Sequence, residues 1–208
     1  MDRAIVFLLC LLPAASLVWA GVTGHLGANP IEAITHATGD WTLRFLLITL
    51  AVTPLGRLTG WNPVIRYRRM LGLFAFSYGV LHLLTYVWLD QFFALGDMVR
   101  DVAKRPFITV GLLAWLSLVP LAATSTEGMI RRLGSRRWRA LHRLIYAAAA
   151  FGVVHYWWLV KADVSRPRIY AVILTLLLGY RLVAAYASAP GRRARSRGSR
   201  RADEESAA

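Results

Sequence analysis

Three of the five histidines in this 208-residue sequence lie in strongly apolar stretches. His82 stands in GVLHLLTYVW (79–88), while His142 and His155 stand in RRWRALHRLIYAAAAFGVVHYWW (136–158). An ionisable side chain in a stretch that would cross a membrane is a candidate functional group, because it is costly to keep there. The alternative for any one of them is a neutral imidazole bonded to a neighbouring helix. His25 and His36 fall in a polar segment, where solvated surface histidines are expected.

The apolar stretches predict the elements that position these histidines. About 20 apolar residues span the hydrocarbon core of a bilayer, and the sequence contains six such segments. They are Ala4–Gly21, Trp41–Leu55, Leu71–Leu89, Phe107–Thr124, Ala140–Val160 and Ile169–Ala187. The predicted fold is an all-α integral membrane protein, a six-transmembrane-helix bundle over residues 1–188. Residues 189–208 are first basic and then acidic, and we predict a disordered cytoplasmic tail there.

The composition agrees with a membrane protein. The chain is 57% hydrophobic, with a mean hydropathy of +0.47 and a net charge of +14. A nucleic-acid-binding protein would spread its basic residues over a soluble fold, whereas these lie between apolar blocks. Cys10 is the one cysteine, which excludes an internal disulfide and a cysteine-based metal cluster. Arg3 before the first apolar run also suits a signal peptide, but the run is long for one and the loop charges fit best with a retained helix.

Those loop charges predict the orientation, because cytoplasmic loops carry the excess of lysine and arginine. Eighteen of the 25 basic residues lie on one side of the predicted bundle, in Arg3, segments 56–70 and 125–143, and the last helix with its tail. Six lie in the opposite loops, and segment 22–40 has none. Both termini are therefore predicted to be cytoplasmic.

Two of the histidines fall at matching depths on different predicted helices. His82 lies seven residues before Leu89, roughly 10 Å from the outer boundary, and His155 lies five residues before Val160, roughly 8 Å from it. Two imidazoles at one height suit the two faces of a planar macrocycle, and imidazole is a good axial ligand for haem iron. A bare divalent metal fits less well, because no carboxylate or cysteine shares that depth.

His142 is predicted to lie at the cytoplasmic boundary, thirteen residues and roughly 20 Å from His155 along one helix. The two therefore cannot bind one iron. The facing end of the helix 71–89 offers Arg68 and Arg69 but no histidine. Three interpretations remain open: a ligand of a second or alternative haem, a part of a flavin or quinone site, and a plain interfacial histidine.

The stretches GDWTLRFLLITLAVTPL (39–55), RYRRMLGLFAFSYGVLHLLTYVWLD (66–90) and RRWRALHRLIYAAAAFGVVHYWW (136–158) carry a family resemblance. Together they resemble the haem-binding membrane subunit of the periplasmic methionine sulfoxide reductase system, the MsrQ/YedZ family of the wider ferric-reductase-like group. The resemblance covers residues 39–186. By position, His82, His142 and His155 match the family's haem histidines. The wider group carries two histidines on each of two helices, whereas the helix 71–89 has one, so one haem b or two remain open.

The resemblance implies a multi-pass protein of the bacterial inner membrane that passes electrons through haem. The acceptor would be a periplasmic molybdopterin-containing reductase that repairs methionine sulfoxide in oxidised proteins. The donor would be the quinone pool or a cytoplasmic flavin reductase, and FMN is associated with the family. This chain would then be the electron-transfer subunit, with the substrate chemistry on its partner.

Three arginines are candidate cofactor-binding residues in the same scheme. Arg68 and Arg69 suit haem propionates or a flavin phosphate, because arginine forms bidentate contacts with such groups. The alternative is that they serve only the topology. Arg181 lies roughly 18 Å into the last helix, where it either snorkels to the inner surface or reaches a cofactor.

Two competing functions also fit the sequence. The first is a cytochrome b that serves another quinone-linked or metal-reducing system. The second is a non-redox transporter or scaffold whose histidines only join helices, which predicts a colourless protein.

Overall fold

The computed structural model describes the backbone of residues 2–160 and 163–205 and the side chains of residues 2–160 and 163–187. Within these ranges every regular element is helical, which confirms the predicted all-α class. The elements are α1 (Arg3–Val22), α2 (Pro30–Thr59), η1 (Asn62–Tyr67), α3 (Arg68–Leu84), η2 (Thr85–Asp90), α4 (Leu95–Lys104), α5 (Pro106–Ala123), α6 (Glu127–Leu141), α7 (Leu144–Leu159) and α8 (Ser165–Glu205).

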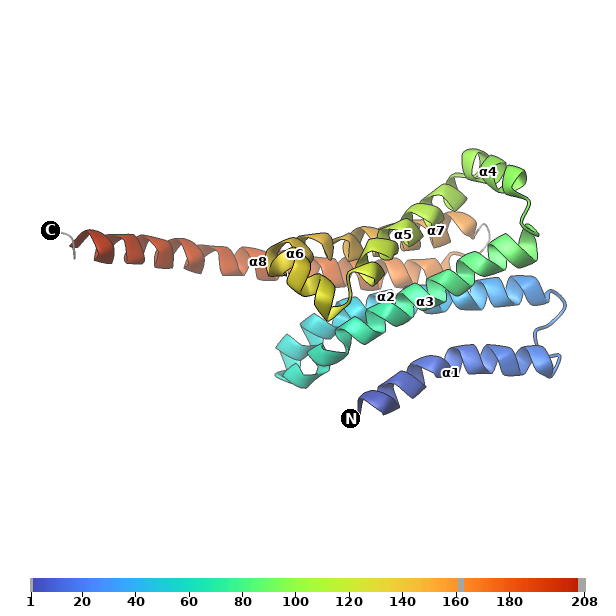
Figure 1. Cartoon of the computed structure of the whole chain (residues 1–208), viewed down its shortest axis with the longest axis horizontal. Helices are drawn as coiled ribbons and strands as arrows, with labels where there is room; N and C mark the ends of the chain where they lie inside the picture. The colour runs from blue at the N-terminus through green and yellow to red at the C-terminus, as the bar shows by residue number, and fades with distance from the viewer. Residues whose placement is uncertain (1, 161–162, 206–208) are drawn as a thin grey trace.

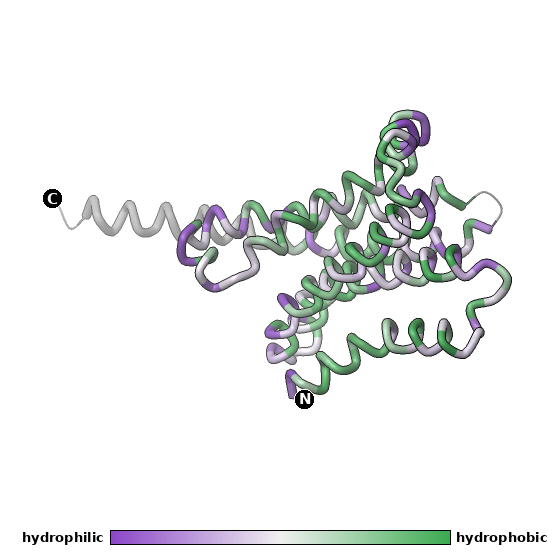
Figure 2. Tube along the Cα trace, turned by 45° about the vertical axis from the view of Figure 1, so that its right-hand side comes forward, coloured by the Kyte–Doolittle hydropathy of each residue, from purple (hydrophilic) through white to green (hydrophobic). Residues whose placement is uncertain are grey.

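Within the described part of the chain, five helical stretches are long and apolar enough to cross a membrane. They are Arg3–Val22, Pro30–Thr59, Asn62–Asp90, Pro106–Ala123 and Ser165–Ala187. The apolar α7 is shorter, at 16 residues. Figure 2 shows hydrophobic residues along the long helices and hydrophilic ones gathered towards their ends and connections. The chain is therefore a helical membrane protein in which five of the six predicted spans reach full length.

The second span starts earlier than predicted. Segment 22–40 was expected to be a loop, but α2 begins at Pro30. The Asn29 side chain accepts a hydrogen bond from the backbone N–H of Glu32 at 3.2 Å and donates one to its carboxylate at 3.0 Å. This reciprocal cap, with a proline in the first helical position, starts the helix. Pro54 also lies inside α2 instead of ending it.

The predicted helix 140–160 is divided in the structure. A polar helix, α6, occupies most of the segment 125–143 that was expected to be a loop, and the Thr126 side chain caps it. His142 follows the end of α6, and α7 begins only at Leu144. The prediction that His142 and His155 share one helix is therefore wrong, because a turn at residues 142–143 interrupts the helix between them. The outer segment 90–106 likewise contains a short helix, α4.

The bundle is built from two helix pairs. α2 packs along α3, and α5 packs along α7, each pair in closer contact than the two pairs are with one another. α8 covers α7 and α2, while α1 lies at the edge of the bundle beside α2 and α3 (Figure 1). The core between these helices contains almost fully buried residues from each pair, including Leu50, Ala75, Ala148 and Ala149. The small alanines let the helix backbones approach closely.

One tyrosine fastens α1 to the bundle. Its hydroxyl, on Tyr78 of α3, accepts a hydrogen bond from the Ala14 N–H at 2.9 Å and donates one to the Cys10 carbonyl at 3.0 Å. These two backbone groups stand four residues apart, the spacing of an α-helical hydrogen bond. They flank Pro13, which has no N–H to give. In a membrane such groups find no water, so a side chain from the neighbouring helix must satisfy them.

We therefore expect Tyr78→Phe to loosen α1. The variant leaves one buried donor and one buried acceptor without their partner, which costs about 1–3 kcal/mol for a buried group. Thermal unfolding in detergent should show a lower midpoint than for the unsubstituted protein. The matched control is Tyr186→Phe, because Tyr186 is exposed and its loss should leave the midpoint unchanged. Equal midpoints for the two variants would contradict the role assigned to the Tyr78 hydroxyl.

The disordered state predicted for residues 189–208 stays a prediction. The side chains of residues 188–208 lie outside the described part of the chain.

Candidate functional site

His82 lies in the last turn of α3 and faces α2. Its Nδ1 is 3.0 Å from the backbone carbonyl oxygen of Thr35. Gly39, one turn further along α2, lies against the ring: a Cβ placed there would be 3.0 Å from the His82 Cε1. The imidazole is therefore tied at one nitrogen and seated against a backbone that has no side chain at that point.

His155 has the same surroundings on the other helix pair. It lies on α7, and its Nδ1 is 2.6 Å from the carbonyl oxygen of Phe107 in α5. Gly111 lies one turn after Phe107, and a Cβ there would come within 2.7 Å of the His155 Nδ1. In both cases a carbonyl and a glycine four residues later, on the neighbouring helix of the same pair, hold one histidine.

This arrangement fixes the tautomer of both rings. A carbonyl oxygen only accepts hydrogen bonds, so each Nδ1 must carry the proton. Each Nε2 then keeps its lone pair available for a metal. An Nδ1–H bonded to a backbone carbonyl is the usual support of a metal-binding histidine. His82 and His155 are thus both prepared as neutral Nε2 ligands.

The two rings lie opposite one another. Their centroids are 6.1 Å apart and their planes make an angle of 75°, which confirms the predicted match in depth. Two metal–nitrogen bonds of about 2 Å each, together with the two ring radii, give roughly 6 Å between the centroids of axial imidazoles. Among the described residues no three metal-binding side chains come together. The pair therefore fits a metal that brings its other ligands with it, as haem iron does.

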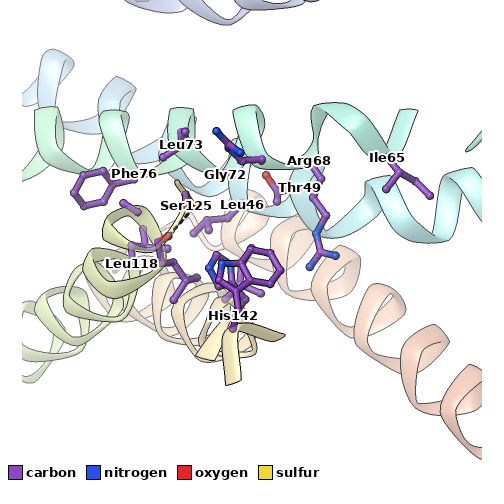
Figure 3. A pocket seen from close by; sticks show the side chains of 15 residues that line it. Leu46, Thr49, Ile65, Arg68, Gly72, Leu73, Phe76, Leu118, Ser125 and His142 are labelled. Carbon is purple, nitrogen blue, oxygen red and sulfur yellow. Dashed lines mark hydrogen bonds between the residues drawn. The ribbon is translucent and has the colours of Figure 1, made fainter. Parts of the chain in front are cut away.

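A cavity of about 280 Å³ lies nearer the other end of the bundle. It is bordered by α2, η1, α3, α5, α6 and α7, and Figure 3 shows Arg68 and His142 on its wall. Its lining includes two arginines and a histidine but no carboxylate: the polar or aromatic members are Thr49, Arg68, Arg69, Phe76, Ser125, Trp138 and His142. Such a lining suits an aromatic or anionic ligand.

His142 is held differently from the other two. Its ring stacks on Trp138 with centroids 3.9 Å apart, and its Nε2 is 3.1 Å from the Thr124 hydroxyl. That hydroxyl already donates its proton to the Pro120 carbonyl at 2.6 Å, so it accepts from His142 Nε2–H. The free lone pair of His142 is therefore on Nδ1. Burial, and after it the Arg68 guanidinium, lower the pKa of His142 from its ordinary value, which favours the neutral ring at pH 7.

Arg68 and Arg69 are brought to the cavity with His142, whereas Arg181 is not among its lining residues. Arg69 lies 3.9 Å from the exposed carboxylate of Glu127. The more enclosed Arg68 makes no ion pair among the described residues, and the positive charge of Arg181 repels it. Arg68 is therefore the side chain with most to gain from an anionic ligand.

Arg181 binds the backbone of α2 one turn before Pro54. It donates to the Leu50 carbonyl at 2.8 Å and to the Tyr146 hydroxyl at 3.0 Å. Leu50 is four residues before Pro54, so its carbonyl has lost its usual helical donor. The guanidinium replaces that donor, as neighbouring side chains do for prolines in membrane helices. This contact explains a charged residue at this depth without a cofactor.

Arg181→Met is expected to destabilise the protein by about 1–3 kcal/mol, because the Leu50 carbonyl is left unpaired. In a Pro54→Ala background the backbone N–H of residue 54 returns, and the same substitution should cost less. Thermal unfolding of the four proteins in this double-mutant cycle measures the difference. An equal loss in both backgrounds would contradict the proline-repair role and favour the cofactor contact.

An aromatic pair connects the two sites. Phe76 lines the cavity and stacks on Trp115, with ring centroids 6.2 Å apart. Trp115 lies one turn after Gly111, the glycine against His155. The Trp115 Nε1 is buried and has no hydrogen-bond partner among the described residues. Along α5, Trp115 therefore lies between Gly111, which touches His155, and Leu118, which lines the cavity.

The residues that support the histidines were not predicted from the sequence. Thr35 and Phe107 act through backbone carbonyls, which leave no trace in side-chain type. Gly39 and Gly111 did leave a signal, since each is a glycine at the height of a histidine on another span, but Gly72, Gly79 and Gly152 look the same in the sequence. Only the packing distinguishes the two that touch an imidazole.

Comparison with known proteins agrees with this geometry. Residues 38–153 match the family described as ferric reductase like transmembrane component. Curated relatives include proteins named protein-methionine-sulfoxide reductase heme-binding subunit MsrQ. The one from Rhodospirillum rubrum is 58% identical over 188 residues, 89% of each chain. The one from Herminiimonas arsenicoxydans is 54% identical over 178 residues, 85% of this chain and 82% of its own.

The match extends over α2 from residue 38, the whole of α3 and α5, and α7 as far as Val153, so it includes His82 and ends two residues before His155. Relatives with that name cover most of both chains at more than half identity. The chain therefore belongs to the MsrQ/YedZ family, within the ferric-reductase-like transmembrane group.

Proposed function

We propose that this chain is the haem b-binding electron-transfer subunit of a protein-methionine-sulfoxide reductase system. It carries electrons across the bacterial inner membrane to a periplasmic molybdopterin-containing reductase. The observation that carries the proposal is the pair of facing imidazoles, each protonated at Nδ1 and 6.1 Å from the other. The names of its relatives supply the system.

The work of the protein at this site is orientation. The Thr35 and Phe107 carbonyls hold the two rings in the ligand tautomer, and Gly39 and Gly111 leave room for them. A haem bound between the rings supplies one-electron chemistry at a potential set by its axial ligands. Reduction of a methionine sulfoxide needs two electrons and two protons, so the partner must collect two such transfers before it releases methionine and water.

The inner cavity is proposed as the entry point. Arg68, Arg69 and His142 suit an anionic or quinoid group there, either a quinone, FMN from a cytoplasmic flavin reductase, or the propionates of a second haem. Phe76 on the cavity wall stacks on Trp115, one helical turn from Gly111, and this aromatic pair is proposed as part of the route towards the facing histidines. Arg181 stays outside the cavity lining, bonded to Tyr146.

Six crossings with both termini in the cytoplasm are proposed for the topology. α7 rises about 24 Å over its 16 residues, slightly short of a core of about 30 Å, and a locally thinned bilayer accommodates the difference. The start of α1 and the later part of α8 point towards the same end of the bundle (Figure 1), which supports an even number of crossings. The excess of arginines at that end supports a cytoplasmic location.

Fluorescent-protein and alkaline-phosphatase fusions test this orientation. A fusion after Ala187 is expected to give fluorescence and no phosphatase activity, because only a periplasmic phosphatase becomes active. A fusion within α4, at Gly96, is expected to give the opposite pattern. Phosphatase activity at both positions would contradict the six-crossing topology.

The function itself is tested by electron transfer to the partner. The chemically reduced protein, mixed anaerobically with a periplasmic molybdenum-containing methionine sulfoxide reductase and a sulfoxide substrate, is expected to show reoxidation of its haem bands. Omitting the substrate should stop the reoxidation after the partner is reduced. A red protein that stays reduced with this partner, but is oxidised by ferric chelates, would indicate a metal-reducing cytochrome instead. A colourless protein would contradict haem binding and favour the non-redox transporter or scaffold.

A further inference from the structure

Residues 91–105 join the spans Asn62–Asp90 and Pro106–Ala123. This connection is too short to extend far from the membrane surface. It consists of a short turn and α4, which lies beyond the ends of α3 and α5, on the opposite side of the bundle from α1 (Figure 1). Both ends of this segment continue directly into spans. Its height is therefore fixed near the outer boundary of the bilayer, whatever else covers it.

α4 has one apolar and one charged face. Leu95, Met98, Val99 and Val102 follow the i, i+3, i+4, i+7 spacing of a single helical stripe, and Asp97, Arg100, Asp101 and Lys104 lie on the other side. Such a division between stripe and charges is typical of helices that lie in the interface of a membrane.

The edge of the charged face is fastened to the protein, which sets the direction of the stripe. The Asp101 carboxylate accepts from the Tyr86 hydroxyl at 3.3 Å and lies 3.3 Å from Arg105. The Thr109 hydroxyl donates to the Val102 carbonyl at 2.5 Å. With these contacts made, Leu95 and Val99 remain 70% and 71% exposed. Met98 and Val102, on the other edge of the stripe, are half-buried. Leu95 and Val99 thus form an exposed apolar edge of α4 that the bundle does not cover.

Two phenylalanines before α4 point to the same conclusion. Phe92 and Phe93 have φ angles of 46° and 62°, in the left-handed region that glycine normally occupies at a helix end. They are nevertheless 76% and 58% exposed. In water this segment would have two unfavourable terms, the backbone strain and the exposure of two aromatic rings to solvent. In a bilayer interface, where aromatic rings are stabilised, the burial of both rings offsets the strain.

We infer that Phe92, Phe93 and the exposed edge of the apolar stripe of α4, Leu95 and Val99, form an anchor that inserts into the outer leaflet of the membrane, between the lipid headgroups and the acyl chains. The occupant of this surface is phospholipid. The charged face of α4 then remains in water as a fixed platform above the membrane. This inference does not depend on the proposed electron transfer.

Spin labels on neighbouring positions test the anchor. In a Cys10→Ala background, Val99→Cys and Arg100→Cys each receive a nitroxide, and the full-length protein is placed in phospholipid nanodiscs. Collision of the label with oxygen, which concentrates in lipid, is compared with collision with a water-soluble nickel chelate. The ratio of oxygen to nickel accessibility is expected to be several-fold higher at position 99 than at position 100.

Two results would overturn the inference. A Val99 label that is as accessible to nickel as the Arg100 label would place the stripe in water. A Val99 label that is shielded from both reagents would mean that another protein surface, and not lipid, covers it. The haem absorption spectrum serves as the folding control, and Leu95→Cys, on the same stripe, replaces Val99→Cys if that variant fails to fold.

Discussion

Proteins carrying His155→Ala or His82→Ala are expected to lose the sharp reduced-minus-oxidised bands of a six-coordinate haem. Each substitution removes one of two imidazoles that face one another at 6.1 Å. His142 does not replace it, because His142 lines the other cavity and is bonded to Thr124. The loss should be close to complete in detergent-purified protein that was expressed with ample haem precursor.

The matched comparison uses the remaining histidines. His36→Ala changes an exposed residue and is expected to leave the spectrum and the haem content as they were. His142→Ala should keep the bands of the outer site, and a partial fall in haem content would assign a second haem to the cavity. Retention of full six-coordinate bands in both His82→Ala and His155→Ala would refute the facing pair as the haem site.

Gly111→Ala is expected to weaken haem binding by roughly 10- to 100-fold, the range seen when the support of a metal-binding histidine is removed. The new Cβ would stand 2.7 Å from the His155 Nδ1, and the helix backbone of α5 cannot yield as a flexible side chain would. The ring must turn away and break its bond to the Phe107 carbonyl. Haem titration of the apoprotein, followed by absorbance, measures the effect.

Two other glycines provide controls for that result. Gly39→Ala should have a smaller effect, since its Cβ would meet the His82 ring at 3.0 Å. Gly179→Ala, in α8, meets nothing within 4 Å and should bind haem normally, with slightly higher stability from the helix propensity of alanine. If Gly111→Ala bound haem as tightly as Gly179→Ala, the close packing of Gly111 against His155 would not be needed for haem binding.

The sequence alone predicted the helical class and the depth of the histidine pair, because both follow from regular spacing. The rise of an α-helix places His82 and His155 at one height once the ends of their spans are known. The start of α2 at Pro30 was missed because the polar segment 30–40 reads as a loop by hydropathy, although its Asn29–Glu32 cap is a local signal. Hydropathy measures how a residue partitions into lipid, whereas a cap decides where the backbone begins to turn.

The inner site was harder to predict for a different reason. Arg68 and Arg69 were expected near His142, and the structure brings the three to one cavity. Arg181 was recognised as unusual, but its contact with the Leu50 carbonyl depends on Pro54 in another helix. A contact between residues 131 positions apart leaves no periodic pattern in a single sequence. The carbonyls of Thr35 and Phe107 were unpredictable in the same way.

The construction of the molecule from two helix pairs has a consequence for its biogenesis. The first pair, α2 with α3, lies wholly before the second pair, α5 with α7, along the chain. Each pair contains one histidine together with the carbonyl and the glycine that orient it. Each helix pair can thus insert and pack during translation, and its histidine is then already oriented by its own pair. A cofactor held by both imidazoles would stabilise the contact between the two helix pairs. If the proposed haem binds between them, haem binding would be the last step of assembly.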